Sequence, residues 1–328
     1  MQEVADLAGA SPITVSRAIR KPDTVSAALR KKIESAIKRL GYVPNMAASR
    51  LASSRSHIVG VVVPTLYNVI FSEYLQALHE ILLPAGFQVI VVNSRYSVEE
   101  EENAVRSLLG HQVDAIIMVG VLHSAQTRIL LKRARIPVVE TFQLAQEPLG
   151  INIGLDQERA GFDATQHLLE SSGNVAFAVG FLDARAKERL AGYRRALETA
   201  GLDPEGKVFA IDKPSCISLG GEIMSMITSN GKLPEAIFCI DDNVALGVLQ
   251  QCRNLGISVP QDILIIGFHD LEFAAWSSPS LSSVRTNRYK LGQMAAEATL
   301  EALPAYRAKP MIIDVGYEIV QRQSSSRD

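Results

Sequence analysis

The sequence has few cysteines and none of the common motifs of a metal or catalytic site. Its three cysteines, Cys216, Cys239 and Cys252, lack a metal-binding spacing, and their odd number argues against a disulfide framework. Walker loops, GxSxG elbows and HExxH motifs are absent, and the six histidines are scattered. We therefore expect no metal, no cofactor and no enzymatic activity, in a chain that folds in a reducing cytoplasm.

Long hydrophobic runs are missing as well. No uninterrupted apolar stretch reaches the roughly 18 residues that a membrane-spanning helix needs. The N-terminus has no basic segment followed by an apolar run, so it lacks the pattern of a signal peptide. We expect neither secretion nor membrane insertion. The sequence leaves open whether residues upstream of Met1 are missing, since Gln2 already lies in the first expected helix.

The composition is that of a globular protein with an uneven distribution of charge. Hydrophobic residues make up 47% of the 328 residues, a length that exceeds one ordinary domain. Residues 1–57 hold ten basic and four acidic side chains, a net charge of +6, whereas the remainder carries −8. A basic head on an acidic body suits a protein whose head alone binds a polyanion. Basic residues on a solvent-exposed helix face would give the same count, so charge alone does not identify a polyanion-binding surface. The pattern of residues has to distinguish the two interpretations.

Three short helices are predicted in the basic head. Residues 2–8 carry apolar side chains at helical spacing, and Gly9 suits the positive φ of a helix end. Ser11 and Pro12 are suited to cap and open a second helix, and a third is expected to follow its cap, Ser26. Three helices with a tight turn between the first two form a helix-turn-helix.

From residue 58 onward, apolar runs of strand length alternate with helical segments. This alternation predicts parallel sheets with helices on both faces, and two similar series predict two doubly wound halves with a cleft between them. The expected strands span residues 58–64, 88–93, 115–120, 137–141, 175–180, 207–211, 236–240 and 263–268. The expected helices span residues 71–83, 99–109, 125–133, 156–169, 187–200, 220–228 and 243–255.

Two runs in the head carry a family resemblance. EVADLAGASPITVSRAIR (3–20) and VSAALRKKIESAIKRLGYVPN (25–45) closely resemble the DNA-binding head of the lactose-repressor (LacI/GalR) family of bacterial regulators. The resemblance continues along the whole chain, and the motifs RKPDTVSAALRKKI, IIGFHDLEF and IIDVGYEI resemble the gluconate and idonate regulators of that family.

The resemblance implies a domain organisation. Residues 1–45 would form the DNA-binding domain, 46–57 a hinge, and 58–328 an effector-binding and dimerisation domain with a periplasmic-binding-protein-like fold. In that fold the chain crosses between the halves three times, here near residues 154–157, 285–287 and 315–317. The first half would then hold residues 58–155 and about 286–316, and the second half residues 156–285 and about 317–328.

On the same resemblance, the second helix of the head reads operator DNA. Thr14 and Ser16 would hydrogen-bond phosphates, which fixes the register without reading bases. Arg17 can present two donors to guanine, a contact worth about 1–3 kcal/mol of discrimination. Family members often place polar side chains at the positions of Pro12 and Ile13. Ile13 could touch a thymine methyl and Pro12 offers only shape, or both serve the helix start and its packing.

The hinge is expected to order only when it is held. Its segment MAASRLASS (46–54) favours helix by composition but is shorter than the roughly 12–15 residues that an isolated helix needs. In the family, two such segments pair in the minor groove and a leucine wedges between base pairs; Leu51 matches that leucine. Packing within the linker is the alternative for Leu51. Asn45, which ends the matching run, is counted among the DNA contacts.

Three side chains of the second half are expected to bind the effector. Arg189 precedes Leu-Ala-Gly-Tyr, where the family commonly keeps an arginine that touches effector oxygens; a surface ion pair is the alternative. Asp241 is expected to accept hydroxyl hydrogens of a ligand, and Asp242 to cap the following helix. His269 matches the gluconate-type branch and is expected to donate to an anionic ligand, with a structural role as the alternative.

The first half is expected to complete the effector site. Thr65 and Phe71 flank its first strand-to-helix loop, and Tyr96 lies beyond its second strand. Glu140 ends a buried strand and is a further candidate that could pair with an arginine such as Arg95.

Together these patterns predict a cytoplasmic, nucleoid-associated bacterial repressor of sugar-acid catabolism. A homodimer would bind pseudo-palindromic operator DNA and be released when gluconate, a related sugar acid or a phosphorylated form fills the cleft. Response to another sugar or a purine, or action with a corepressor, stays open. The head and the missing motifs disfavour a solute receptor and an enzyme. The short polar tail, residues 321–328, has no leucine heptads, so a tetramerising helix is not expected.

Overall fold

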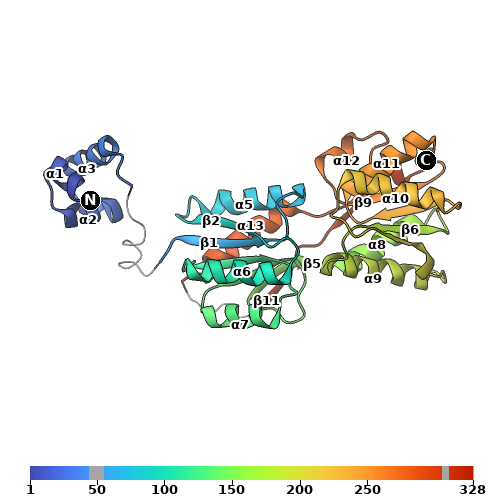
Figure 1. Cartoon of the computed structure of the whole chain (residues 1–328), viewed down its shortest axis with the longest axis horizontal. Helices are drawn as coiled ribbons and strands as arrows, with labels where there is room; N and C mark the ends of the chain where they lie inside the picture. Colours follow the sequence, from blue (N-terminus) through green and yellow to red (C-terminus); the bar gives the residue numbers. More distant parts are fainter. Residues whose placement is uncertain (44–54, 305–309, 328) are drawn as a thin grey trace. The chain divides into compact units, whose positions relative to one another are not determined.

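The computed structural model describes residues 1–43, 55–304 and 310–327 (Figure 1). The chain divides into two compact units, Met1–Ser56 and His57–Asp328, here called the head and the body. Within the described ranges, no helix is long and apolar enough to cross a membrane. Nor do His, Cys, Asp and Glu side chains of those ranges form a group of three that could hold a metal ion.

The head is a helix-turn-helix unit, as predicted. It consists of α1 (Gln2–Ala8), α2 (Pro12–Arg20), the 3-10 turn η1 (Pro22–Thr24) and α3 (Ala27–Leu40). Gly9 ends α1 in the left-handed conformation, with φ 64°, which glycine adopts without strain. The Ser11 hydroxyl accepts a hydrogen bond from the Thr14 amide at 3.2 Å and so caps α2. Ser26 precedes α3, but its side chain makes no capping hydrogen bond, so that part of the prediction is wrong.

A small apolar core holds the three helices of the head together. Val4 of α1 and Val15 of α2 are fully buried, and Ile33 of α3 is 1% exposed. Because Val15 faces this core, the opposite side of α2 faces solvent.

The first sheet of the body has the strand order β11-β5-β4-β3-β1-β2, and all neighbouring strands are parallel. Its strands are β1 (Ile58–Val63), β2 (Gln88–Asn93), β3 (Ala115–Val119), β4 (Val138–Gln143), β5 (Ile151–Leu155) and β11 (Met311–Asp314). Its helical segments are η2 (Val69–Phe71), α5 (Ser72–Leu82), α6 (Val98–Gly110), α7 (Ala125–Ala134) and α13 (Arg288–Ala302). Apolar side chains of α5 and α13 cover one face of the sheet, and those of α6 and α7 cover the other.

The second sheet has the order β12-β10-β9-β8-β6-β7, parallel except for the antiparallel edge strand β12. Its strands are β6 (Val175–Val179), β7 (Val208–Ala210), β8 (Ala236–Cys239), β9 (Leu264–His269), β10 (Ser282–Arg285) and β12 (Glu318–Val320). Its helical segments are α8 (Gln157–Leu169), α9 (Ala184–Thr199), η3 (Glu205–Lys207), α10 (Ile217–Ser229), α11 (Asp242–Leu255), α12 (Glu272–Trp276) and η4 (Gln323–Ser325).

The chain passes between the two sheets three times. It leaves the first sheet after β5, returns to it after β10, and leaves it again after β11. The half of the body built on the first sheet is therefore discontinuous in sequence, because α13 and β11 follow the whole series from α8 to β10 (Figure 1).

The two helices α10 and α11 approach closely at a pair of glycines. A Cβ atom on Gly220 would lie 2.0 Å from the Val244 carbonyl oxygen, and one on Gly247 would lie 1.9 Å from the Ile217 carbonyl oxygen. Both distances are too short for a real carbon atom, so the packing of these helices depends on glycine at both positions.

Each strand and helix expected in the body is present, β2 with the expected ends and the others with ends shifted by one to three residues, which confirms the predicted α/β architecture. The largest shifts, of three residues, concern the starts of α9 and α10: α10 begins at Ile217 and not at Gly220. The helix α9 begins at Ala184 and not at Lys187 because the Asp183 carboxylate caps it by accepting from the Ala186 amide at 2.8 Å. The strands β5, β10, β11 and β12 and the helices α12 and α13 were not foreseen.

Candidate functional site

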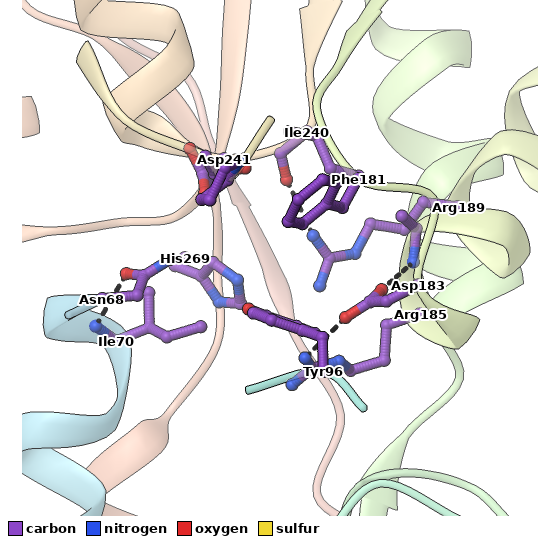
Figure 2. Close-up of a pocket in the computed structure, with 13 residues that line it drawn as sticks. Asn68, Ile70, Tyr96, Phe181, Asp183, Arg185, Arg189, Ile240, Asp241 and His269 are labelled. Atoms are coloured by element: carbon purple, nitrogen blue, oxygen red, sulfur yellow. Dashed lines mark hydrogen bonds and ion pairs between the residues drawn. The ribbon is translucent and has the colours of Figure 1, made fainter. Parts of the chain in front are cut away.

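A small pocket lies in the body where the carboxyl ends of strands from both sheets meet. It is lined from the loops that follow β1, β2, β6, β7, β8 and β9, the position at which open α/β sheets bind ligands (Figure 2). Its lining residues, which define the inner pocket, are Asn68, Ile70, Tyr96, Phe181, Asp183, Arg185, Ala186, Arg189, Pro214, Ser215, Ile240, Asp241 and His269.

The structure brings four of the six expected effector residues into this pocket. Tyr96, Arg189, Asp241 and His269 line it, although they come from different loops. Thr65 lines an adjoining outer cleft instead.

Phe71 lines neither cavity. It is 1% exposed and packs edge to face against Phe142, with ring centroids 5.3 Å apart. The guanidinium carbon of Arg185 lies 5.8 Å from the centre of the Phe71 ring. Phe71 therefore packs behind Arg185, a residue that lines the inner pocket. A position near a strand end does not by itself tell whether a side chain lines a pocket or packs behind one.

Arg189 is buried in the wall of the inner pocket. Its Nε donates to Gln157 Oε1 and its Nη1 donates to the Ile240 carbonyl oxygen, both at 2.7 Å. The guanidinium carbon lies 3.7 Å from the centre of the Phe268 ring, a cation-π contact. These contacts fix the orientation of the guanidinium and leave Nη2 without a protein partner among the described residues. Arg189 is therefore not in the surface ion pair considered from the sequence.

Asp183 and Arg185 form an ion pair in the same wall. Arg185 Nη2 donates to Asp183 Oδ2 at 2.7 Å, and both side chains line the pocket (Figure 2). Burial by itself raises the pKa of Asp183, but Arg185 and the Ala186 amide outweigh it, so the pKa lies below its usual value. Sequence reasoning missed both residues because it placed the start of α9 three residues late. Their position between the buried strand β6 and the helix that follows it was the available signal.

Asp241, and not Asp242, caps α11. Asp241 Oδ1 accepts from the Val244 amide at 3.0 Å, while the rest of the side chain lines the inner pocket. Asp242 is fully buried, and its carboxyl oxygens accept from the Ser283 hydroxyl and the Leu271 amide, each at 2.6 Å. The expected cap at Asp242 is wrong: the helix starts one residue earlier than its sequence pattern implied, and Asp242 instead ties α11 to the segments that follow β9 and form β10.

His269 lines the pocket as an uncharged side chain. Burial first, and then the nearby charges of Arg189, Arg288 and Arg185, lower its pKa well below 6.5. Its Nδ1 lies 3.0 Å from the Thr286 hydroxyl. If that hydroxyl donates, Nε2 carries the proton and can donate to a ligand. His269 can thus offer a hydrogen bond but not a positive charge to an anion.

The outer cleft adjoins the inner pocket. Tyr96, Phe181 and Pro214 line both cavities. The rings of Tyr96 and Phe181 meet at an angle with centroids 6.2 Å apart. The remaining lining residues of the outer cleft are Pro64, Thr65, Tyr67, Asn93, Arg95, Lys213 and Cys216.

Glu140 belongs to a separate buried cluster. Its Oε1 lies 3.4 Å from His123 Nε2, and its Oε2 accepts from the Leu149 amide at 2.6 Å. The Nδ1 atom of His123 lies 2.9 Å from Glu101 Oε1. The expected partner Arg95 pairs with Glu100 instead, so Glu140 is neither an arginine partner nor a lining residue of the inner pocket.

In the head, α2 presents two of the expected DNA-reading side chains to solvent. Ile13 is 70% exposed, and Arg17, one turn later, is also exposed. Pro12, Thr14 and Ser16 are half-buried, and the Thr14 hydroxyl lies 2.9 Å from that of Ser11. The exposure of Ile13 argues against the packing role considered for it. Asn45 and Leu51 lie outside the described residues.

Comparison with known proteins finds a matching family model for the head and another for the body. The family model "Bacterial regulatory proteins, lacI family" matches residues 1–45, and the model "Periplasmic binding protein-like domain" matches residues 165–325. The HTH-type transcriptional regulator GntR of Pseudomonas aeruginosa is 36% identical to this chain over 99% of its length and 95% of that protein. The chain belongs to the LacI family.

Two further LacI-family proteins support this assignment. The HTH-type transcriptional regulator IdnR of Escherichia coli is 32% identical, with 97% of this chain and 96% of that protein covered. The solved structure of the lac repressor dimer bound to operator and the anti-inducer ONPF matches with a TM-score of 0.83 at 25% identity, covering 98% of this chain and 97% of that chain. As a LacI-family member, the chain is a DNA-binding transcriptional regulator and not an enzyme, which confirms the prediction from sequence.

Proposed function

We propose that this regulator represses genes of sugar-acid catabolism and leaves its operator when a gluconate-type effector fills the inner pocket. The observation that carries the proposal is the chemistry of that pocket. Guanidinium donors from Arg185 and Arg189 share one small cavity with the acceptor oxygens of Asn68 and Asp241. Such a set suits a molecule with both an acid group and hydroxyl groups. The names of the relatives GntR and IdnR agree with this ligand class.

In this proposal each DNA-contacting residue of the head has its own role on the operator. Arg17 reads guanine, Ile13 contacts a thymine methyl, Pro12 contributes shape, and Thr14 and Ser16 hold phosphates. Asn45 and Leu51 add contacts at the junction of head and hinge and at the centre of the site.

The regulator would act in the cytoplasm as a homodimer on a pseudo-palindromic operator, because two-fold protein symmetry matches two-fold DNA symmetry. The solved lac repressor relative is a dimer on its operator, which supports this assembly. Residues 46–57 would form the hinge, within an organisation of head, hinge and two body halves. An effector lowers operator affinity only to the extent that it binds the DNA-free state of the regulator more tightly than the DNA-bound state. The free energy of this coupling is typically about 1–3 kcal/mol.

The test of the proposed function is operator binding of the full chain in the presence and absence of gluconate, at fixed salt. We expect gluconate to weaken operator binding by about 5- to 150-fold, the usual range of such coupling. Glucose and hypoxanthine, as a neutral sugar and a purine, serve as controls. Tighter binding with gluconate would indicate a corepressor, and an effect of glucose or hypoxanthine alone would overturn the sugar-acid assignment.

The role of Arg17 can be tested in the same assay. We expect Arg17→Ala to weaken binding by about 1–3 kcal/mol and to abolish the preference for guanine at one position of each half-site. Arg39, an exposed arginine near the end of α3, provides a matched control, since Arg39→Ala removes the same charge from the head. Equal losses for both variants on specific and non-specific DNA would show that Arg17 supplies only charge.

A further inference from the structure

The chain enters the body through a residue in an unusual backbone conformation. The boundary between head and body falls between Ser56 and His57, directly before β1. His57 has φ 56°, in the left-handed region that residues other than glycine rarely occupy. Strand residues have a negative φ, so β1 does not continue in a straight line toward the N-terminus. His57 instead turns the chain at the edge of the first sheet.

Asp114 holds His57 in this conformation. The Oδ2 atom of Asp114 accepts a hydrogen bond from the His57 amide at 2.6 Å. The Asp114 amide in turn donates to the carbonyl oxygen of Ile58 at 2.8 Å. Asp114 directly precedes β3, which pairs with β1, so its side chain extends the contact between these two strands by one residue.

Contacts from the start of β2 also hold His57. Its carbonyl oxygen accepts a hydrogen bond from the Gln88 amide at 2.8 Å. Its imidazole ring lies against Phe87, with ring centroids 5.4 Å apart. A left-handed conformation is unfavourable for a residue with a side chain and persists only where its surroundings hold it. Here both backbone polar groups of His57 and its ring are held by neighbouring strands.

The second half of the body has the same carboxylate contact at the equivalent place, but without the turn. Glu235 directly precedes β8, and its Oε2 accepts from the Gly173 amide at 2.7 Å. The strand β8 pairs with β6 in the same way as β3 pairs with β1. Gly173 has no positive φ, although glycine could adopt one. The carboxylate contact therefore does not by itself require a left-handed residue, and the turn at His57 is a separate feature of the junction with the head.

We propose that His57 and Asp114 are positioning residues for operator binding, which set the direction in which the proposed hinge, residues 46–57, leaves the body. A hinge with a fixed start loses less conformational entropy when it orders on DNA than a hinge with a free start. Both residues act through the hinge, and neither has to touch DNA. This inference rests on the proposed role of the hinge and extends it into the body.

The first test removes the carboxylate. A duplex that the natural protein selects from random sequences serves as the operator, and binding of the full chain is compared with binding to non-specific DNA at the same salt concentration. Asp114→Ala should weaken operator binding about tenfold, because the turn at His57 loses its support. Its non-specific binding should not change, because the basic side chains of the head are intact.

Two further variants control this test. Asp114→Asn should stay within about threefold of the natural protein on the operator, since its amide oxygen can still accept from the His57 amide. Glu235→Ala removes the equivalent carboxylate from the second half and should leave operator binding unchanged. Melting temperatures of Asp114→Ala and Glu235→Ala compare the cost in stability, so that a loss of operator binding is not mistaken for unfolding.

The second test changes the direction of the chain at His57. Glycine adopts a positive φ without strain, whereas the β-branched valine favours the extended conformation of a strand. His57→Gly and His57→Val both remove the imidazole ring and its contact with Phe87. We expect His57→Gly to bind the operator within about threefold of the natural protein, and His57→Val to bind about tenfold more weakly. Equal operator affinities for these two variants would overturn the inference.

Leu51→Ala, within the proposed hinge, distinguishes this inference from the proposed function. If Leu51→Ala loses operator binding while Asp114→Ala keeps it, the positioning inference is overturned and the hinge role stands. If Leu51→Ala binds the operator as the natural protein does, the hinge role fails and the inference fails with it. Equal losses for Asp114→Ala and Glu235→Ala, or equal losses of Asp114→Ala on operator and non-specific DNA, would show that the carboxylate only stabilises the body, and would also overturn the inference.

Discussion

Burial controls the charge of individual carboxyl and imidazole groups in the body. Asp242 is fully buried, and desolvation raises its pKa to about 8, although hydrogen bonds from Ser283 and Leu271 oppose the shift. Desolvation therefore favours the uncharged form of this carboxyl, which ties α11 to its neighbours. Burial likewise favours the uncharged form of His269, because it lowers the pKa of the imidazole. His123 keeps its positive charge because Glu101 and Glu140 flank it and raise its pKa.

The buried His123 cluster predicts a dependence of stability on pH. Burial alone would lower the pKa of His123, but Glu101 and Glu140 outweigh it and raise the pKa to about 9. Because the folded-state pKa exceeds the unfolded value, this stabilisation is complete below about pH 6.5 and is lost as the pH rises through 9. Its upper limit is about 3 kcal/mol, since one pKa unit corresponds to about 1.4 kcal/mol.

We expect His123→Gln to destabilise the protein near pH 6 and to flatten the fall in stability between pH 6.5 and 9. Urea unfolding at a series of pH values measures this difference. His79→Gln, at an exposed position of α5, is the matched control and should follow the natural protein. Identical pH profiles for His123→Gln and the natural protein would show that the cluster does not bind a proton on folding.

The side chains of the candidate site were predictable where strand ends could be located. Tyr96, Arg189, Asp241 and His269 each follow a recognisable strand or open a recognisable helix, and all four meet in the inner pocket. Arg185 could not be placed because the Ala-rich start of α9 has a weak helical pattern, and its start is fixed by a cap that only the folded loop reveals. No sequence pattern indicates which side chains of the two body halves meet in the inner pocket.

At the scale of elements, the sequence predicts the strands and helices that carry a continuous apolar run or a regular apolar pattern. It misses the strands that form only by pairing with a neighbouring strand. The buried strands β1, β3 and β9 are continuous apolar runs, which parallel sheets require. By contrast, β10 has the polar sequence SSVR and β12 has only three residues, so each becomes a strand through pairing with the existing sheet. Local propensity does not contain that information.

The contact between α10 and α11 predicts opposite effects for two adjacent glycines. Gly220→Ala places a methyl group 2.0 Å from the Val244 carbonyl oxygen and should force the helices apart, at a cost of about 2 kcal/mol or more. Gly221→Ala meets no atom closer than 4.0 Å and should stabilise α10 by about 0.5–1 kcal/mol, since alanine favours helix. Chemical denaturation of the two variants measures both effects. Equal stabilities would contradict the close approach of the helices.

At the scale of the whole body, Arg288 joins the two halves beside the inner pocket. Its Nη1 donates to the carbonyl oxygen of His269 in the second sheet, and its Nη2 donates to both carboxylate oxygens of Glu73 on α5 at 3.0 and 3.1 Å. His269 has φ 101°, a conformation that costs a non-glycine residue about 1–3 kcal/mol. We infer that Arg288 helps to hold this strained pocket residue in place.

We therefore expect Arg288→Gln to weaken gluconate binding by about tenfold, as pocket geometry is lost with the contact. Tyr289→Phe is the matched control, because the Tyr289 hydroxyl bonds Glu80 of the same helix α5 at 2.6 Å without reaching the second sheet. Titration of both variants, with their melting temperatures, separates pocket geometry from stability. An equal loss of gluconate affinity in both variants would assign the effect to the packing of α5 and α13 alone.

The three crossings of the chain also constrain the order in which the body is completed during synthesis. Within the body, β1 to β5 leave the ribosome first, but α13 and β11, which cover and extend their sheet, emerge only after the whole series from α8 to β10. The second sheet in turn receives its edge strand β12 at residues 318–320. Neither half can reach its final set of neighbours until these last elements have been translated, so the apolar surface that α13 covers on the first sheet stays uncovered until α13 emerges.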